Sequence, residues 1–566
     1  MTTARRSLFL VLVALLLLLV AAGVAMAGKP TKVIILTFDQ MRPEYAKQFD
    51  MTNLLWLQRN GANFKKAYVG HMASETVVSH NVIASGLFPK HMGWSDEVMR
   101  DVDNILGYGT LTDPEPIITV GDLSYTQFEA IVDHYGYPKL GDYMHEAFPG
   151  SKVAFFGEKY YQVTSMAASN ADFWVTFSGK KNVADLPNTA TLPWTGKYRM
   201  PDAMTNAALV PYNNVPDYIL TDDRFKISSG NSSDAYGTKT TSPANLYPED
   251  GRYAPGPYPG HRSGDEWVAD AAIKVIQNEE WSALHLNFSG IDKIGHMWGG
   301  PPSDTVAWQP GNLVTEVHMA FQAKNADDQL GNIIEALQTE EQWDDTMIVV
   351  LADHASTWAQ SKYYYDVDGG GNYSWYYDPN NTCANTGYGT GIGLDLNNEA
   401  VLAPLNVNDN LAYSYQSTAI EAWLIDQSWD KKVIEAAAMK TMPGVIATYI
   451  RNGDRYILAS TNKMTSAERN WWGTHGQELV DTMAFAGAAD VVGLLKDRTS
   501  YGVYGDHGGA QQDVQSIPMV FYSKGIQPST RGTAFRLVDV LPTVLLNMGI
   551  PEMAPMDGTA YDLNIK

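Results

Sequence analysis

The sequence predicts an α/β fold built around a central, mostly parallel sheet. Three apolar, β-branched runs support this prediction, at 33–38, 281–288 and 347–351, and each is followed within a few residues by an aspartate. A continuous apolar run of this length is typical of a strand buried on both faces, as in parallel sheets covered by helices. Ligands of such sheets bind beyond the carboxyl ends of the strands, so the polar residues after these runs form the candidate site.

Length and charge limit the classes of function. A chain of 566 residues suits a large catalytic domain with insertions, or two to three smaller units. Its formal net charge of -23 argues against nucleic acid, or an anionic membrane, as a partner held by bulk charge. A protein this acidic that handles an anionic substrate needs cations in its site, and bound divalent metal ions are the obvious means.

The N-terminal segment predicts export. Arg5 and Arg6 precede an apolar run that starts at Leu8, and Ala25-Met-Ala27 forms a small-x-small cleavage site. Together these features predict a signal peptide over residues 1–27, cleaved after Ala27, and a secreted, periplasmic or cell-surface protein. An uncleaved membrane anchor is the alternative, because the apolar run is of spanning length. The single cysteine, Cys383, excludes both an intrachain disulfide and a Cys-rich zinc module.

The first strand run ends at Asp39, which is therefore a candidate metal ligand. Apolar spacing predicts a helix over 51–61, and a second strand is predicted over 62–69. The chain then enters the polar segment 74–80, Ser-Glu-Thr-Val-Val-Ser-His.

This polar segment resembles a turn followed by a short helix. A hydroxyl at the start of such a helix lies beside free backbone N–H groups that suit an anion. Thr76 is therefore a candidate nucleophile for a phosphorus centre, with Ser74 and Ser79 as rivals.

An aspartate at the end of a first strand, then Thr-x-x-Ser-His before Ser85-Gly-Leu-Phe-Pro89, resembles the alkaline phosphatase superfamily, specifically its type I phosphodiesterase/nucleotide pyrophosphatase branch. Those enzymes carry Thr-Phe-Pro-Asn-His before Thr-Gly-Leu-Tyr-Pro, and alignment of the Gly-Leu-aromatic-Pro element places their nucleophile on Thr76. The resemblance implies an alkaline-phosphatase-like three-layer sandwich with a central, mostly parallel sheet over residues 28–566, plus inserted cap regions.

Further polar groups follow the later strands. Asp292 and His296 are four residues apart, which on a helical turn places both side chains on one face, within reach of one ion. A strand that ends at Leu351 leads to Asp353-His354, and Gly505-Asp-His507-Gly precedes a strand at 517–522. The resemblance implies two sets of three metal ligands: Asp292, His296 and His507, and Asp39, Asp353 and His354. The oxygen of Thr76 is expected to contact the ions as well.

Mixed histidine and carboxylate ligands are typical of catalytic zinc, whereas an all-oxygen set would indicate magnesium or calcium. Two divalent ions, zinc by this argument, are therefore expected as cofactors. They would stand on either side of an in-line displacement at phosphorus.

Two positions depart from the pattern of the relatives. Glu97 stands where members of the diesterase branch carry an asparagine that contacts the phosphoryl oxygens, and an acid there would repel a phosphate unless it binds metal or turns away. An outward-facing carboxylate is the alternative. Lys159 matches the first residue of a Lys-x-Arg pair of monoesterases, but Tyr161 replaces the arginine. Lys159 is expected to complete the oxyanion cradle.

Two insertions are expected in the catalytic domain. Residues 180–263 are rich in Pro, Gly, Asn, Asp and Tyr, and predict an ordered cap or long surface loops near the site. Residues 356–504 form the second insertion. Within it, a strand, a helix and a hairpin about Asn452-Gly453 predict a small α+β subdomain over about 415–460.

These observations predict an exported two-metal phosphoric ester hydrolase that acts on a small phosphate ester or nucleotide through a phosphothreonine intermediate. The resemblance implies that Thr76 takes the phosphoryl group and that water then releases it. A phosphonate hydrolase with the same residues is one alternative. An exported phosphate-ester-binding protein that has lost catalysis is another. A sulfatase is discounted, because Cys383 lies far from the nucleophile loop.

Overall fold

The computed structural model describes most of the chain after the N-terminal segment. The described residues are 28–107, 117–120, 123–157, 159–168, 170–176, 215–220, 263–292, 295, 311–357, 403–501 and 505–565. The predicted signal peptide, most of the predicted cap at 180–263, and His296 lie outside them. None of the helices in the described part of the chain has both the length and the apolar character that a membrane span requires.

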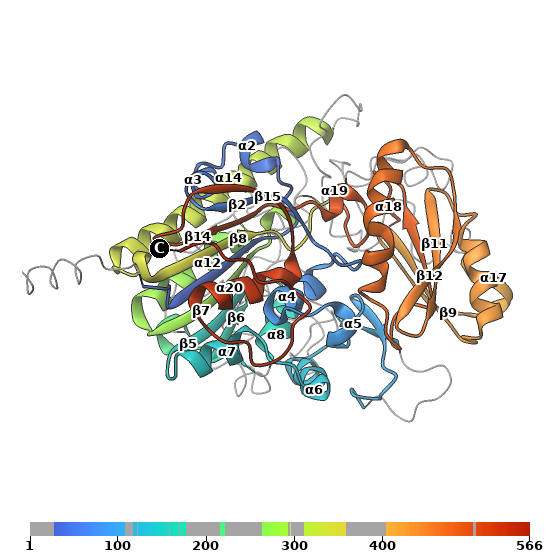
Figure 1. The fold of residues 1–566 in the computed structure, drawn as a ribbon, viewed down its shortest axis with the longest axis horizontal. Helices are drawn as coiled ribbons and strands as arrows, with labels where there is room; N and C mark the ends of the chain where they lie inside the picture. Colours follow the sequence, from blue (N-terminus) through green and yellow to red (C-terminus); the bar gives the residue numbers. More distant parts are fainter. Residues whose placement is uncertain are drawn as a thin grey trace, which may run out of the picture.

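The core is an eight-stranded sheet in which all strands but one are parallel (Figure 1). Only β14 runs against its neighbours β8 and β2. The strands are, in sheet order, β15 (Ser529–Arg536), β2 (Ala62–Tyr68), β14 (Met519–Tyr522), β8 (Thr346–Leu351), β1 (Lys32–Phe38), β7 (Trp281–Phe288), β5 (Lys152–Gly157) and β6 (Phe173–Thr176).

Apolar side chains explain why β8, β1 and β7 form the centre of this sheet. Nearly every residue of the three strands is buried, as the continuous apolar runs predict. In register, Leu36 of β1 lies beside Leu286 of β7 and Val350 of β8. The predicted mostly parallel α/β sheet is thus confirmed, and the three aspartate-bearing strands are immediate neighbours.

Helices cover both faces of the sheet and complete three layers (Figure 1). One face is covered by α3 (Thr52–Asn60), α12 (Ser263–Asn278) and α14 (Gly311–Thr339), and the other by α4 (Thr76–Ser85), α8 (Tyr160–Ala167) and α20 (Val540–Met548). The remaining described α-helices of the core are α2 (Tyr45–Gln48), α5 (Pro89–Met92), α6 (Tyr125–Tyr135), α7 (Leu140–Ala147), α11 (Asp217–Leu220) and α19 (Gln512–Gln515).

A second, five-stranded sheet stands beside the core, at the right of Figure 1. Its strands, in sheet order, are β12 (Arg455–Thr461), β11 (Val445–Asn452), β13 (Val491–Leu495), β10 (Ala419–Leu424) and β9 (Leu411–Gln416), accompanied by helices α17 (Trp429–Met439) and α18 (Ser466–Asp481). The strand, helix and hairpin predicted over about 415–460 are present. The sheet extends further, because β9 begins before that range and β13 lies after it. The division of the chain into one catalytic domain with two insertions stays a prediction.

A buried charge cluster joins this second sheet to the core. Asp490 accepts hydrogen bonds from Arg451 Nη2 at 2.8 Å and from the backbone N–H of Leu424 at 2.9 Å, and the Nζ of Lys432 lies 2.9 Å away. Arg100 Nη2 donates to the same carboxylate from 3.4 Å. Arg100 ends β3 (Val98–Arg100), which pairs with β4 (Ile117–Thr119). Asp490 therefore fixes the position of β3 against the second sheet.

Replacement of Asp490 by asparagine is expected to destabilise the protein strongly. The change would leave three buried cations without their carboxylate, a loss that typically costs about 3–5 kcal/mol. Chemical denaturation would measure it. The matched control is Asp430→Asn on the exposed first turn of α17, expected to cost no more than about 0.5 kcal/mol. Equal denaturation midpoints for the two variants would contradict the structural role of Asp490.

Candidate functional site

The carboxyl ends of neighbouring strands bring the candidate site together. Asp39 directly follows β1, Asp292 follows β7 on its first turn, and Asp353-His354 follow β8. Because these strands are parallel neighbours, their ends meet at one edge of the sheet. His507 precedes β14, and since β14 is antiparallel, the chain before it lies at that same edge.

One group of candidate metal ligands matches the predicted set. Asp39, Asp353 and His354 are all buried, and each offers a ligand atom such that the three atoms lie within 4.8 Å of one another. His354 Nε2 lies 3.6 Å from Asp39 Oδ1 and 3.4 Å from Asp353 Oδ2. The backbone N–H of Gln40 donates to the other oxygen of Asp353 at 3.1 Å, which fixes the orientation of that carboxylate.

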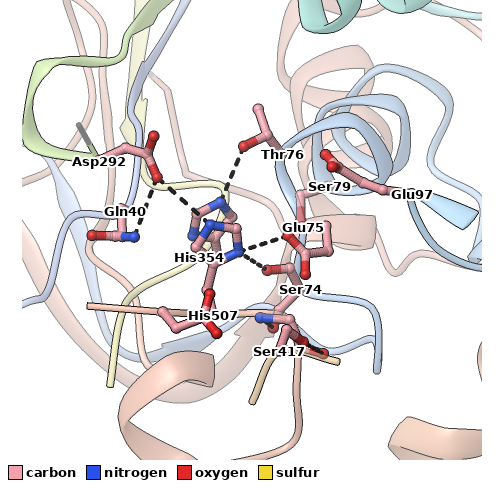
Figure 2. Close-up of polar contacts among 12 residues, drawn as sticks. Gln40, Ser74, Glu75, Thr76, Ser79, Glu97, Asp292, His354, Ser417 and His507 are labelled. Atoms are coloured by element: carbon pink, nitrogen blue, oxygen red, sulfur yellow. Dashed lines mark hydrogen bonds and ion pairs between the residues drawn. The ribbon is translucent and has the colours of Figure 1, made fainter. Parts of the chain in front are cut away.

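A second group contains Asp292 and His507, as predicted, together with His354. His507 Nε2 lies 3.6 Å from Asp292 Oδ1, and the rings of His354 and His507 stack with centroids 3.7 Å apart. Figure 2 shows the two rings between Asp292 and the loop that carries Ser74, Glu75 and Thr76. His354 therefore reaches both groups. Because His296 is outside the described residues, its role as a ligand stays a prediction.

The carboxylates of these groups fit divalent cations. Asp39 Oδ1 and Asp353 Oδ2 are buried and have no hydrogen-bond partner among the described residues. Burial raises the pKa of Asp353 well above its usual range, and the nearby Asp39 raises it further, while Lys159 opposes the shift. Burial likewise raises the pKa of Asp39, against the opposing charge of Lys159. Buried carboxylates this close together need cations between them to remain ionised.

Thr76 lies beside these groups at the N-terminus of α4. Its Oγ1 is 3.3 Å from His354 Nε2, and it accepts a hydrogen bond from Lys159 Nζ at 3.0 Å. The same Nζ lies 2.8 Å from Asp39 Oδ2 and 2.8 Å from Asp292 Oδ2. The lysine ammonium thus links Thr76 to both groups of ligands. Lys159 comes from the end of β5, the next strand beyond β7.

The two rival hydroxyls point elsewhere. Ser74 Oγ donates to the backbone oxygen of Gly509 and accepts from the N–H of Gly508, both at 3.1 Å. Ser79 Oγ lies 3.3 Å from Nε2 of the buried His71. Of the three hydroxyls, only that of Thr76 contacts both Lys159 and a candidate metal ligand, so the geometry favours Thr76 over Ser74 and Ser79 as the candidate nucleophile.

Glu97 turns toward the nucleophile loop. Its Oε1 accepts a hydrogen bond from the backbone N–H of Val77 at 3.3 Å, so the alternative of an outward-facing carboxylate is wrong. Burial raises the pKa of Glu97 to about 7. The charge of Glu75 adds to this shift, whereas His507, Lys159 and the N–H of Val77 oppose it.

Sequence reasoning missed three supporting residues. Glu75 Oε2 lies 2.8 Å from Nδ1 of His507, so the other ring nitrogen faces the site. Gln40 Nε2 donates to Asp292 Oδ1 at 3.2 Å, and Asn287 Nδ2 donates to Asp39 Oδ2 at 3.0 Å. Each is adjacent to, or within a few residues of, a ligand, but only the folded structure reveals what it contacts.

The residue after His507, Gly508, adopts a backbone conformation that requires glycine. Its φ is +96°, in the region that favours glycine, and a Cβ at this position would lie 2.0 Å from Oε1 of Glu75. Glycine is therefore required for the His507 loop to pack against Glu75.

Two groups of acidic and histidine ligands around one hydroxyl, at the carboxyl edge of a mostly parallel sheet, define the class of metal-dependent phosphate ester hydrolases. The chain belongs to the type I phosphodiesterase/nucleotide pyrophosphatase family, whose pattern it matches over residues 33–368. The resemblance to the alkaline phosphatase superfamily is thereby confirmed.

Individual relatives agree with this assignment. The chain is 22% identical to the alkaline phosphatase PhoK of Sphingomonas sp., over 95% of this chain and 92% of PhoK. Its fold is similar to the crystal structure of the alkaline phosphatase PafA, with a TM-score of 0.55 and 15% identity over 95% of this chain and 99% of that chain. The murine ectonucleotide pyrophosphatase/phosphodiesterase 5, in an inactive form with AMP, gives a TM-score of 0.50 and 11% identity, over 94% and 97% of the two chains.

Removal of divalent metal with a chelator is expected to destabilise the folded protein. Each ion that binds only the native state at about 100 times its Kd contributes about 2.7 kcal/mol. For a chain of 566 residues, loss of two such ions should lower the melting temperature by about 4–5 °C. Differential scanning calorimetry, before and after zinc is added back, measures the change.

The control separates the candidate site from other histidine–aspartate pairs. His91→Ala removes an exposed pair with Asp557 and should keep the full response to chelator. A double variant, Asp39→Asn with Asp353→Asn, should lose the response. If the double variant still responded as the wild type does, these residues would not be the metal ligands.

Proposed function

We propose that this protein is an exported two-metal phosphoric ester hydrolase in which Thr76 is the nucleophile. The observation that carries this proposal is the contact of a single buried hydroxyl with Lys159 and His354, next to both groups of candidate ligands. Family membership supplies the reaction class. The substrate is proposed to be a small phosphate ester or a nucleotide.

The mechanism follows from what each side chain reaches. Bound divalent ions, proposed to be zinc because both groups mix imidazole with carboxylate, would lower the pKa of the Thr76 hydroxyl and offset charge on the leaving oxygen. Thr76 Oγ1 attacks phosphorus while the bond to the ester oxygen breaks and that oxygen leaves with a proton. Water then attacks the phosphothreonine, which releases phosphate and restores the hydroxyl.

Charged and polar groups near Thr76 would hold the reacting phosphoryl group. Lys159 Nζ is within 3.0 Å of the attacking oxygen and is placed to balance charge that develops on the phosphoryl oxygens. Backbone N–H groups at the start of α4 add donors without side-chain charge. Two carboxylates, those of Asp39 and Asp292, contact Lys159 and keep its ammonium group at this position.

Four positions substituted in a solved variant of PafA support the choice of Thr76 and Lys159 as site residues. That variant is substituted at one threonine, one asparagine, one lysine and one arginine. These four positions have the same spacing along PafA as Thr76, Glu97, Lys159 and Tyr161 have along this chain. Thr76 and Lys159 keep the residue type, and Glu97 and Tyr161 do not.

Export is proposed from the N-terminal sequence. Arg5, Arg6, the apolar run and the Ala25-Met-Ala27 site support a cleaved signal peptide. N-terminal sequencing of the protein released from its host would give Gly28 as the first residue if cleavage follows Ala27.

Thr76→Ala is expected to abolish turnover while both metal positions stay filled. Without Oγ1 no phosphothreonine forms, so the rate should fall by at least about a thousandfold. The measurement is the rate of purified, zinc-loaded protein with a phosphate monoester, a diester, a nucleotide and a phosphonate, together with metal content by elemental analysis.

Ser79→Ala is the matched control, because it removes a nearby hydroxyl whose hydrogen-bond partner is His71. It should retain wild-type rates. Full activity in Thr76→Ala would refute the nucleophile assignment. Wild-type protein that binds zinc and phosphate but cleaves none of the four substrates would indicate a binding protein instead.

A further inference from the structure

Glu97 places a carboxylate against the anion-binding end of α4. It lies between α5 and β3, and its Oε1 accepts from the N–H of Val77, the residue directly after the nucleophile. The first N–H groups of a helix have no partner within the helix and are natural donors to an oxyanion. Glu97 therefore places a carboxyl group at a donor that a phosphoryl oxygen would otherwise use, and this group is negatively charged above its pKa of about 7.

The charges around Glu97 do not cancel its own. Glu75 is the acid whose charge adds to that of Glu97, and Asp96 and Glu421 interact with each other and with Glu75; all three are buried. The nearby cations are Lys159 and His507. Lys159 contacts Asp39 and Asp292, and His507 contacts Glu75, so each cation already faces other carboxylates.

Tyr161, which stands where some relatives carry an arginine, contributes no positive charge to the site. It lies on the first turn of α8, two residues after Lys159, and it is only partly buried. A phenol there cannot balance a second phosphoryl charge as a guanidinium would. Among the lysines and arginines that the structure describes, Lys159 is thus the only one hydrogen-bonded to Thr76.

We infer that Glu97 determines specificity, and that it selects a phosphorus centre with one negative charge over one with two. This inference rests on the proposed hydrolase function. A phosphomonoester is a dianion near neutral pH, whereas a phosphodiester and a phosphonate monoester are monoanions. An additional charge on the phosphoryl group raises the repulsion from Glu97, or requires a proton to be taken up, and either effect disfavours the dianion.

The differential effect, not the total affinity, is the signature of this role. A residue that weakens all substrates equally changes no preference, whereas a charge beside the reacting oxygens affects substrates according to their own charge. Neutralisation of Glu97 should therefore raise kcat/KM for the dianion much more than for the monoanions.

The experiment compares three substrates that share one leaving group: 4-nitrophenyl phosphate, bis(4-nitrophenyl) phosphate and 4-nitrophenyl phenylphosphonate. Glu97→Gln should raise the monoester-to-diester ratio of kcat/KM by about tenfold or more, because one close charge is removed. The diester and phosphonate arms identify which monoanion the wild type prefers.

Two further variants separate charge from shape and distance. Glu97→Asp keeps the carboxyl group and should leave the ratio within about threefold of wild type. Glu421→Gln should do the same, because it removes a buried carboxyl group of β10 that interacts with Asp96 and Glu75 and not with the N–H of Val77. Metal content and melting temperature verify that each variant is folded and loaded.

An unchanged ratio in Glu97→Gln, with activity retained, would overturn this inference alone. An equal change in Glu421→Gln would also overturn it, because the effect would then be one of general charge. Wild-type protein that cleaves none of the three esters would overturn the proposed function itself.

Discussion

Three buried aspartates on three adjacent strands are the constraint on which the rest of the site depends. Strands β8, β1 and β7 are parallel and in register, so Asp353, Asp39 and Asp292 necessarily meet at one edge. Like charges this close cannot all remain ionised without counter-charge. Lys159 supplies one positive charge, and the raised pKa values of Asp39 and Asp353 indicate that it is not sufficient. Divalent cations would balance the remaining negative charge. The order of strands in the sheet thus favours metal binding, because it gathers the three aspartates.

The single antiparallel strand completes the arrangement. Because β14 runs against β8, the loop before it ends at the same edge as the aspartates, and His507 stacks on His354 there. Gly508 allows this loop to approach Glu75, which in turn orients the His507 ring. The antiparallel direction of β14 therefore brings His507, from late in the sequence, to the same edge as Asp39, from early in the sequence.

Features of the fold that depend on neighbouring residues could be predicted from the sequence. Apolar runs that end in an aspartate predicted the central strands and the edge of the sheet at which the aspartates gather, because strand burial and strand ends both follow from neighbouring residues. Gln40, Glu75 and Asn287 could not be predicted, since their roles arise from contacts between distant segments such as Glu75 with His507. The five-stranded sheet was predicted only in part. Strand β13 joins it through long-range pairing with β10 and β11, and β9, which forms a hairpin with β10, begins before the predicted range. The reach of His354 to both ligand groups likewise depends on ring orientation, which spacing does not reveal.

The second sheet contacts the segments that carry Glu97 and Thr76. Glu97 immediately precedes β3, in which Val98 packs into the apolar core of that sheet and Arg100 binds Asp490. The backbone N–H of Arg100 also donates to Gly487 at 2.8 Å. Met72, four residues before Thr76, belongs to the same apolar core. The nucleophile loop and Glu97 are thus both held against the second sheet. His507 also contacts it, since its carbonyl accepts a hydrogen bond from the N–H of Thr418 at 3.1 Å, whereas the three aspartates follow strands of the first sheet. Changes in the second sheet that shift β3 would therefore move Glu97 relative to Val77, while Asp39, Asp292 and Asp353 stay at the ends of strands of the first sheet.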